Sequence, residues 1–202
     1  MLKRLFDIFC SLLGLLVFFP LFLVVSIWIK LDSSGPIFYR QVRVGLNGKP
    51  FRIHKFRTMR VDAENEGRLT VGKDKRITRS GEILRKSKVD ELPQLIDVLC
   101  GDMSLVGPRP EVQEFIDCYP SGIKELVLSV RPGITDRASI EMVDENEILS
   151  QYDDPRAAYI EHILPLKQKY YVDYVENNNV FIDIKLIFQT IFKIVWKRTS
   201  HS

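Results

Sequence analysis

RKSKVDELPQLIDVLCGDMSLVGPRP, residues 85–110, is the most informative segment of this 202-residue chain. Apolar residues at three- and four-residue spacing predict a helix over its first half. Two adjacent carboxylates, Asp90 and Glu91, lie within that pattern, just before Leu92 and Pro93. Proline removes a backbone donor and disfavours helical geometry in the residue before it. The acid pair is therefore predicted to lie at a helix start or a kink, where backbone amides can face it.

The second half of this segment is predicted to form a stiff loop. Gly107 and the prolines on either side of Arg109 indicate a rigid turn, which fixes the direction of that arginine. Together with Arg85, the acid pair and this loop could hold a metal ion and a phosphate. A simpler alternative stays open, because adjacent acids on a helix are commonly solvated, and Lys86 is spaced for a surface ion pair with Asp90.

The composition excludes several classes of protein. A net charge of +3 is too small to indicate nucleic-acid binding. The cysteines are odd in number and widely spaced, which predicts reduced thiols in a cytosolic compartment. No histidine has a second His or Cys at ligand spacing, so we expect the histidines to be structural or exposed and no zinc site to form. These residues are Cys10, Cys100 and Cys118, and His54, His162 and His201.

Residues 1–30 are predicted to form a membrane segment. The uncharged run from Ile8 to Ile29 would be about 33 Å long as a helix, which is enough to cross a bilayer core and too long for a signal peptide. A simple spanning helix is one alternative. Pro20 near the centre of the run and basic residues on both flanks favour a re-entrant helix, with both ends facing the cytoplasm.

Residues 31–178 are predicted to form a cytoplasmic domain that is α+β and mostly helical. Alternating residues before and after Leu46-Asn47-Gly48 predict a short β-hairpin between Asp32 and Met59. A polar loop, 61–80, then leads to a helix with Ser80 as its N-cap. Residues 111–130 predict a second helix, interrupted near Tyr119-Pro120.

Residues 179–202 are predicted to form an amphipathic helix and a tail. Lys185, Gln189, Lys193 and Lys197 fall on one side, and several Phe residues with Trp196 favour the other. Such a helix suits the membrane interface, although a core-packed helix is the alternative.

Several motifs together give the chain a recognisable pattern: GPIFYRQVRVGLNGKPFRIHKFRTM, DKRITRSG, DELPQL, MSLVGPRP, RPGIT and DIK. This pattern resembles the bacterial sugar transferase family, the monotopic phosphoglycosyl transferases. The resemblance implies a re-entrant membrane helix, a compact catalytic domain and an interfacial C-terminal helix. Phe19 departs from the family pattern, which has Ser or Thr before the kinking proline. Lys88 stands where Ser is common, and this third cation is expected to lower the pKa of Asp90.

The resemblance also implies roles for site residues. Asp90 would be the nucleophile, and Glu91 would bind a Mg²⁺ ion on the diphosphate of the substrate. Arg85 and Arg109 would clamp phosphate oxygens. The substrate-binding positions that the resemblance further nominates are Lys55, Arg57, Pro108, Pro110, Thr135 and Asp183.

The implied reaction moves a sugar 1-phosphate from a UDP-sugar to polyprenol (undecaprenyl) phosphate at the cytoplasmic leaflet of the bacterial inner membrane. UMP is released, and the product starts a glycan such as O-antigen, capsule, exopolysaccharide or glycoprotein. A single-displacement sugar transferase and a non-catalytic membrane scaffold are the alternatives, and self-association is left open. The segment from Asp136 to Asp154 departs from the family pattern and is either an insertion that shapes sugar choice or a solvated segment without a role.

Overall fold

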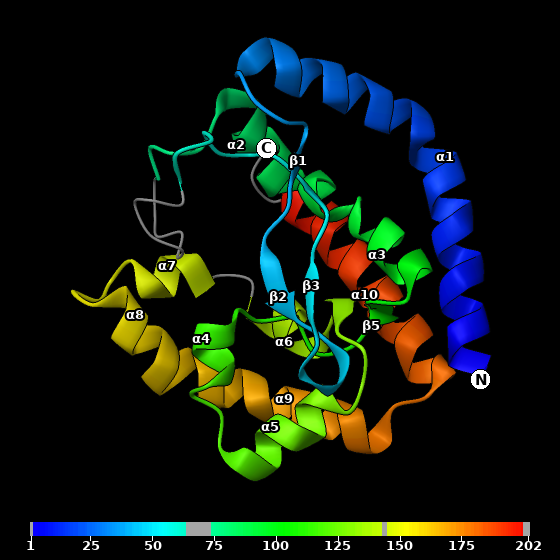
Figure 1. The fold of residues 1–202 in the computed structure, drawn as a ribbon, viewed down its shortest axis with the longest axis vertical. Coiled ribbons are helices and arrows are strands. Elements are labelled where there is room, and N and C mark those ends of the chain that lie inside the picture. The colour runs from blue at the N-terminus through cyan, green and yellow to red at the C-terminus, as the bar shows by residue number, and fades with distance from the viewer. Residues whose placement is uncertain (1, 64–73, 143–144, 200–202) are drawn as a thin grey trace.

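The computed structural model describes residues 2–63, 74–142 and 145–199. Helices dominate, with a few short strands, so the mostly helical α+β class is confirmed. Figure 1 shows helices α4 to α9 packed at one end of the molecule, with the N-terminal helix α1 running along its side. The predicted loop over 61–80 falls largely on residues 64–73, outside the described part.

Helix α1, Leu2–Asp32, contains Pro20 and carries the long apolar run. Among the described residues it is the one helix long and apolar enough to cross a membrane. Figure 1 shows that it bends along its length, from the N-terminus to the far end of the domain. A proline inside a helix removes one backbone hydrogen bond, which is a known cause of such bends.

Both ends of α1 are attached to the same globular body. Near its start, Arg4 Nη1 donates to the carbonyl of Val98 over 2.7 Å, and the buried carboxylate of Asp7 accepts from the hydroxyl of Ser104 over 2.8 Å. At its end, Asp32 accepts from the backbone and hydroxyl of Ser80. Apolar side chains bury the last turns of the helix: Val25, Ile29, Phe56 and Leu84 form one cluster.

The predicted hairpin is confirmed, as two short antiparallel ladders. Strand β1, Phe38–Tyr39, pairs with β4, Lys55–Phe56, and β2, Val42–Val44, pairs with β3, Pro50–Arg52. The 3-10 turn η1, Leu46–Gly48, joins the two sides, with Asn47 at a φ of 54°. Asparagine tolerates this left-handed conformation well, which suits it to a tight turn.

Helix α2, Arg79–Ser87, begins two residues earlier than an N-cap at Ser80 would allow. Thr78 is the N-cap, because its hydroxyl accepts from the amide of Gly81, while Ser80 donates to Asp32 instead. Gly81 is packed so closely on the main chain of Thr58 that a Cβ there would lie 2.0 Å from a carbonyl oxygen. Helix α2 is thereby held directly against the segment that follows β4.

A parallel pair of strands, which the sequence analysis missed, connects the central loop to the RPGIT segment. Strand β5, Ser104–Val106, lies beside β6, Gly133–Thr135. Where the chains meet, a Cβ on Gly133 would lie 2.1 Å from the amide nitrogen of Gly107. Both positions therefore need glycine, because any side chain would force the two backbones apart.

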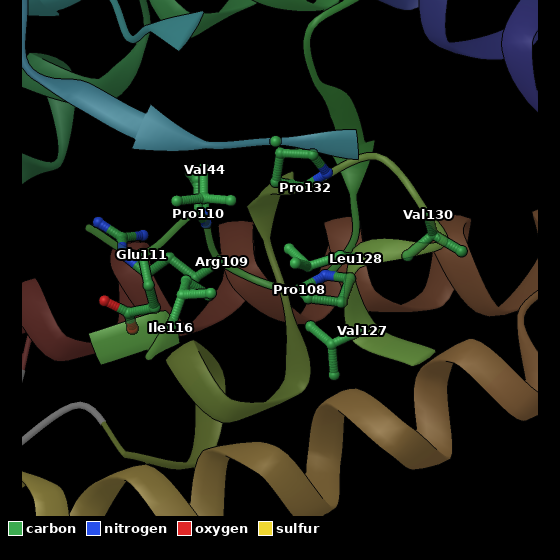
Figure 2. A pocket seen from close by; sticks show the side chains of 11 residues that line it. Val44, Pro108, Arg109, Pro110, Glu111, Ile116, Val127, Leu128, Val130 and Pro132 are labelled. Atoms are coloured by element: carbon green, nitrogen blue, oxygen red, sulfur yellow. The ribbon is translucent and has the colours of Figure 1, made fainter. Parts of the chain in front are cut away.

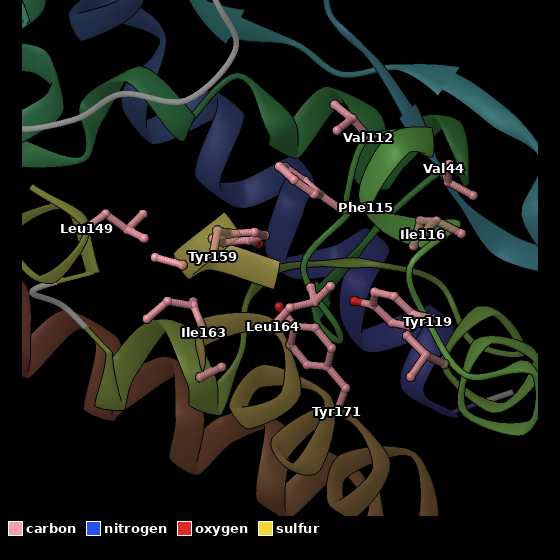
Figure 3. Close-up of a cluster of buried hydrophobic side chains, with 13 residues drawn as sticks. Val44, Val112, Phe115, Ile116, Tyr119, Leu149, Tyr159, Ile163, Leu164 and Tyr171 are labelled. Atoms are coloured by element: carbon pink, nitrogen blue, oxygen red, sulfur yellow. The ribbon is translucent and has the colours of Figure 1, made fainter. Parts of the chain in front are cut away.

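The second half of the chain is helical, and the break near Tyr119-Pro120 is confirmed between α4 and α5. A cluster of apolar and tyrosine side chains forms its core (Figure 3). The elements are α4 Gln113–Ile116, α5 Ser121–Leu128, α6 Arg137–Glu141, α7 Glu145–Leu149, α8 Pro155–Ala158, the π-helix η4 Tyr159–Ile163 and α9 Leu164–Asn177.

Helix α10, Val180–Thr199, packs one side on the domain and exposes apolar residues on the rest of its described surface. Leu186 and Asp183 are buried, whereas Phe181 is 85% exposed. The other exposed apolar side chains are Phe188, Ile191 and Phe192. The predicted faces of Trp196 and Lys197 stay predictions, because the structure does not describe the side chains of these two residues.

Candidate active site

The acid pair lies at a break between two helices, as predicted. Helix α2 ends where Lys88 adopts a left-handed conformation, with a φ of 58°. A single 3-10 turn, η3, Val89–Glu91, follows, and helix α3, Gln94–Cys100, begins after Pro93. This break turns Asp90 into the interior, where it is 8% exposed. An ordinary solvated acid on a helix surface is therefore excluded.

Glu91 is paired with two cations from other parts of the chain, rather than with backbone amides. Lys55 Nζ, in β4, lies 2.8 Å from Glu91 Oε1. The guanidinium of Arg109 donates to both oxygens of the same carboxylate. The hairpin, the η3 turn and the loop after β5 therefore meet at one carboxylate.

The two neighbouring acids are shifted in opposite directions. Burial, and then the charge of Glu91, raise the pKa of Asp90 to about 6 against the opposing effect of Lys55. Burial also acts to raise the pKa of Glu91, but the charges of Arg109, Lys55 and Lys88 outweigh it and hold that pKa well below its usual range. Glu91 is therefore a fixed anion, whereas Asp90 titrates close to neutral pH.

Lys88 acts on Asp90 in the expected direction, but it does not decide the pKa of this carboxylate. This lysine does act to lower the pKa of Asp90, and so does Arg85, but burial prevails. Arg85 Nε donates to the hydroxyl of Thr58 over 3.0 Å. Asp90 Oδ1 is buried and has no hydrogen-bond partner among the described residues. A buried acceptor without a donor costs folding free energy, because it has lost its water and gained no other partner. Such an atom indicates where a ligand or ion would complete the site.

The Pro108-Arg109-Pro110 loop is held from two sides. The carbonyl of Pro108 accepts from the amide of Gly133 over 2.9 Å, and the carbonyl of Pro110 accepts from Arg43 Nη1 over 3.0 Å. A small pocket opens beside this loop (Figure 2). Its walls are mostly apolar: Val44, Ile116, Val127, Leu128, Val130 and Pro132 line it together with the loop. The loop is thus rigid, as its prolines predict.

Three nominated residues have their polar atoms engaged away from the acid pair. Arg57 donates to three backbone carbonyls, of residues 33, 34 and 36, and so closes the end of α1. Thr135 shares a hydrogen bond with Thr190 over 2.7 Å. Asp183 is fully buried, pairing with Lys3 and accepting from a tyrosine hydroxyl. The structure gives these three residues structural contacts, and a part in substrate binding stays a prediction.

Two buried acids near the site were not predicted. Asp97 in α3 accepts from the backbone amide of His54 over 2.8 Å and pairs with the imidazole, which holds the start of β4 and hence Lys55. Asp136 is the N-cap of α6 and acts electrostatically on Arg109. Its cap pattern, an Asp three residues before Ser139, was a usable signal. No sequence signal pointed to the pairing of Asp97 with His54.

Comparison with known proteins shows which family this chain resembles over nearly its whole length. A model of the bacterial sugar transferase family matches residues 1–197. The N-acetylgalactosaminephosphotransferase of Aeromonas hydrophila, named for UDP-N-acetylgalactosamine and undecaprenyl phosphate, is 38% identical over 96% of this chain. The UDP-glucose:undecaprenyl-phosphate glucose-1-phosphate transferase of Klebsiella pneumoniae is 37% identical over 95% of the chain.

The chain spans 44% and 39% of the lengths of these two proteins. An exopolysaccharide production protein of Rhizobium leguminosarum is matched over nearly its whole length, at 40% identity over 94% of this chain and 93% of that protein. The match therefore includes the acid pair, the proline loop and both terminal helices. The chain belongs to the bacterial sugar transferase family.

Proposed function

We propose that this chain is a phosphoglycosyl transferase that moves a sugar 1-phosphate from a UDP-sugar to polyprenol phosphate and releases UMP. The names of the similar proteins support the class of reaction. The observation that carries the proposal is the buried Oδ1 of Asp90, which has no hydrogen-bond partner in the described part of the chain and lies next to a carboxylate paired with two cations.

Asp90 is the proposed nucleophile. Its carboxylate oxygen attacks the phosphorus that carries the sugar, and the bond from that phosphorus to the bridging oxygen of UMP breaks. An aspartyl phosphosugar is formed. An oxygen of polyprenol phosphate then attacks the same phosphorus and releases the Asp90 carboxylate. A pKa of about 6 leaves most of Asp90 ionised at neutral pH, as a nucleophile requires.

The surrounding cations provide the charge neutralisation that phosphoryl transfer needs. Glu91 pairs with both Lys55 and Arg109 and so keeps these two cations together. Arg85 donates a hydrogen bond to the hydroxyl of Thr58. A diphosphate between these groups would meet donors from the hairpin, from helix α2 and from the rigid loop. Positioning and electrostatic stabilisation account for most of the catalysis of phosphoryl transfer.

The residues at the site fit a Mg²⁺ ion. Among the described residues no group of three or more Asp, Glu, His or Cys side chains is arranged to hold a metal. Mg²⁺ commonly takes one or two carboxylates and completes its shell with water and substrate phosphates. Asp90 and Glu91 would hold it, and the ion would then neutralise charge on the diphosphate.

We also propose that α1 is re-entrant, that α10 lies in the membrane interface and that the site faces the cytoplasm. Attachment of both ends of α1 to one body supports this, since a spanning helix would separate its ends across the bilayer. Exposed apolar side chains on both helices, such as Leu16 at 74% and Phe181 at 85%, suit contact with lipid. Cysteines introduced at Lys3 and Ser34 in a cysteine-free chain should both react with an impermeant maleimide from the cytoplasmic side of membrane vesicles. Labelling from opposite sides would indicate a spanning helix.

Turnover of a panel of UDP-sugars tests the reaction. We expect UMP release with polyprenol phosphate and Mg²⁺, and a loss of roughly 10³-fold or more in Asp90→Asn, because the nucleophile is removed. Wild-type protein incubated with a radiolabelled UDP-sugar and no acceptor should retain the label after denaturation, and Asp90→Asn should not.

Each outcome separates the alternatives. Turnover without trapped label, and with full activity in Asp90→Asn, would favour single displacement without this nucleophile. Silence of the wild type across a broad panel would favour a membrane scaffold. Glu91→Gln serves as the comparison variant, since it leaves Asp90 in place but weakens the hold on Lys55 and Arg109.

A further inference from the structure

We infer that Glu111 is a positioning residue for Arg109, held in place by a buried polar network that reaches into the segment predicted to be an insertion. The inference rests on the proposed function, because its effect is expressed in phosphosugar transfer. Glu111 directly follows the Pro-Arg-Pro loop and is 5% exposed. Figure 2 shows Arg109 and Glu111 together on the wall of the pocket.

A chain of hydrogen bonds and ion pairs leads away from Glu111. The hydroxyl of Tyr159 donates to Glu111 Oε1 over 2.7 Å. Lys167 Nζ, from α9, donates to the same hydroxyl over 3.1 Å and pairs with Glu145 Oε2, in α7, over 2.8 Å. Arg43 lies 3.9 Å from the other oxygen of Glu111. Residues from β2, η4 and α9 therefore meet at Glu111, and α7 joins the network through Lys167.

The network also holds the loop through its backbone. The amide of Val44 donates to the carbonyl of Glu111 over 2.9 Å, and Arg43 donates to the carbonyl of Pro110. These bonds fix the main chain on the side of the hairpin. The side chain of Glu111 adds a second anchor on the side of η4 and α9. The two anchors hold the main chain directly after Arg109, and the ion pair with Glu91 holds the guanidinium of Arg109 itself.

The protonation states support a stable arrangement. Burial, and then the charge of Glu111, raise the pKa of Tyr159 well above its usual value, so its hydroxyl keeps the proton that it donates. Two anions, Glu111 and Glu145, are balanced by Lys167 and Arg43. A buried ionic network of this kind gives little net stability over an apolar core of the same shape, and its best-attested benefit is a unique geometry. The geometry fixed here is that of the loop carrying Arg109.

This connection gives the segment from Asp136 to Asp154 a defined role. Glu145 lies within it, at the start of α7, and Leu149 is packed in the same buried cluster as Tyr159 (Figure 3). The segment is therefore tied to the catalytic loop through Lys167 and Tyr159. It is part of the support of the active site, in contrast to a solvated segment without a role.

A pair of tyrosine variants tests the inference. Tyr159→Phe removes the hydroxyl that links Glu111 to Lys167. Tyr119→Phe is the matched control, because Tyr119 lies in the same cluster, but its buried hydroxyl has no partner among the described residues. We expect Tyr159→Phe to lower kcat for UMP release about tenfold, with KM for the UDP-sugar within about twofold, since small displacements of a clamp on the transition state are costly. Tyr119→Phe should keep kcat within about twofold of wild type.

A second comparison separates positioning from general stability. In an Arg109→Lys background the effect of Tyr159→Phe should shrink to less than about twofold, because both changes act on one clamp and are not additive. Glu111→Gln keeps an acceptor for Tyr159 but removes the charge, and it should lower kcat in the same direction. Equal kcat in the two tyrosine variants, or an undiminished effect in the Arg109→Lys background, would overturn the inference while leaving the proposed function intact. Absence of wild-type turnover would overturn both.

Discussion

Two clusters of buried charge lie on either side of the Pro-Arg-Pro loop, and they differ in how completely they are satisfied. Around Glu111, each carboxylate has a donor or a cation within reach, through Tyr159, Lys167 and Arg43. Arg43 Nε is the one buried side-chain atom of this network without a partner among the described residues. Around Asp90, Lys55 and Arg109 are engaged by Glu91, and one oxygen of Asp90 has no hydrogen-bond partner among the residues that the structure describes.

The difference indicates which cluster holds geometry and which is available for chemistry. A satisfied network resists change, because removing any member exposes the others to the cost of an unpaired buried charge. An unsatisfied carboxylate is destabilising in the protein without substrate and is available to a phosphorus atom or a cation. Strained or unsatisfied groups of this kind concentrate at functional sites.

The largest effect is expected in the satisfied cluster. Lys167→Met leaves Glu111 and Glu145 facing each other without the cation between them, and should lower the free energy of unfolding by about 3 kcal/mol. Chemical denaturation in detergent measures this loss. Lys169→Met, at an exposed position of the same helix, is the control and should change stability by less than about 0.5 kcal/mol. Equal effects of the two variants would show that the network is not balanced as described.

A change of opposite sign is expected at Asp90. Its folded pKa of about 6 lies above the usual value of 3.8, so the charged form is penalised in the fold. The penalty is fully present above pH 6 and disappears as the pH falls toward 3.8. Asp90→Asn should therefore raise the free energy of unfolding at pH 8 by about 2 kcal/mol and change it little near pH 4.

Glu91→Gln is the natural comparison for this variant. It weakens the pairing of Lys55 and Arg109 and should lower stability at pH 8. Destabilisation by Asp90→Asn at pH 8 would contradict the interpretation of Asp90 as an unsatisfied buried anion.

The smallest effect is on the pH dependence of the wild type. If Asp90 must be ionised to attack, kcat/KM should be nearly constant above pH 7, fall to about half near pH 6 and then fall about tenfold per pH unit. The raised pKa of Arg109 keeps this arginine charged through this range, and the lowered pKa of Glu91 keeps that carboxylate ionised, so neither should contribute a second step. Steady-state UMP release from pH 5 to pH 9 measures the profile, and constant activity down to pH 5 would exclude a nucleophile with this pKa.

Local sequence patterns predicted much of this molecule. The break at Asp90-Glu91 followed from Pro93, the hairpin from Leu46-Asn47-Gly48, and the rigid loop from its prolines. The long apolar helix followed from hydropathy. Each is a short-range property, fixed by backbone geometry or by periodicity within a few residues.

The pKa of Asp90 and the contacts of individual side chains could be predicted less well from the sequence. Lys88 lowers the pKa of Asp90 as expected, but burial outweighs this effect and raises the pKa. Arg57 was nominated for the substrate, and its guanidinium closes the end of α1. Desolvation depends on how much chain surrounds a group, and a partner can come from any part of the sequence. Neither quantity is visible in the residues next to it.

The sequence by itself determined the long apolar helix, the class of fold and the helix break at the acid pair, because apolar runs, glycine and proline act locally. The tertiary structure decided the pairing of β5 with β6, the meeting of Lys55, Arg109 and Glu91, and the network that ends at Glu145. Contacts of this kind join residues far apart in the chain, as at Lys3 and Asp183, which are separated by 180 positions. Such contacts form when packing removes water and leaves each buried charge dependent on the partner that the fold brings to it.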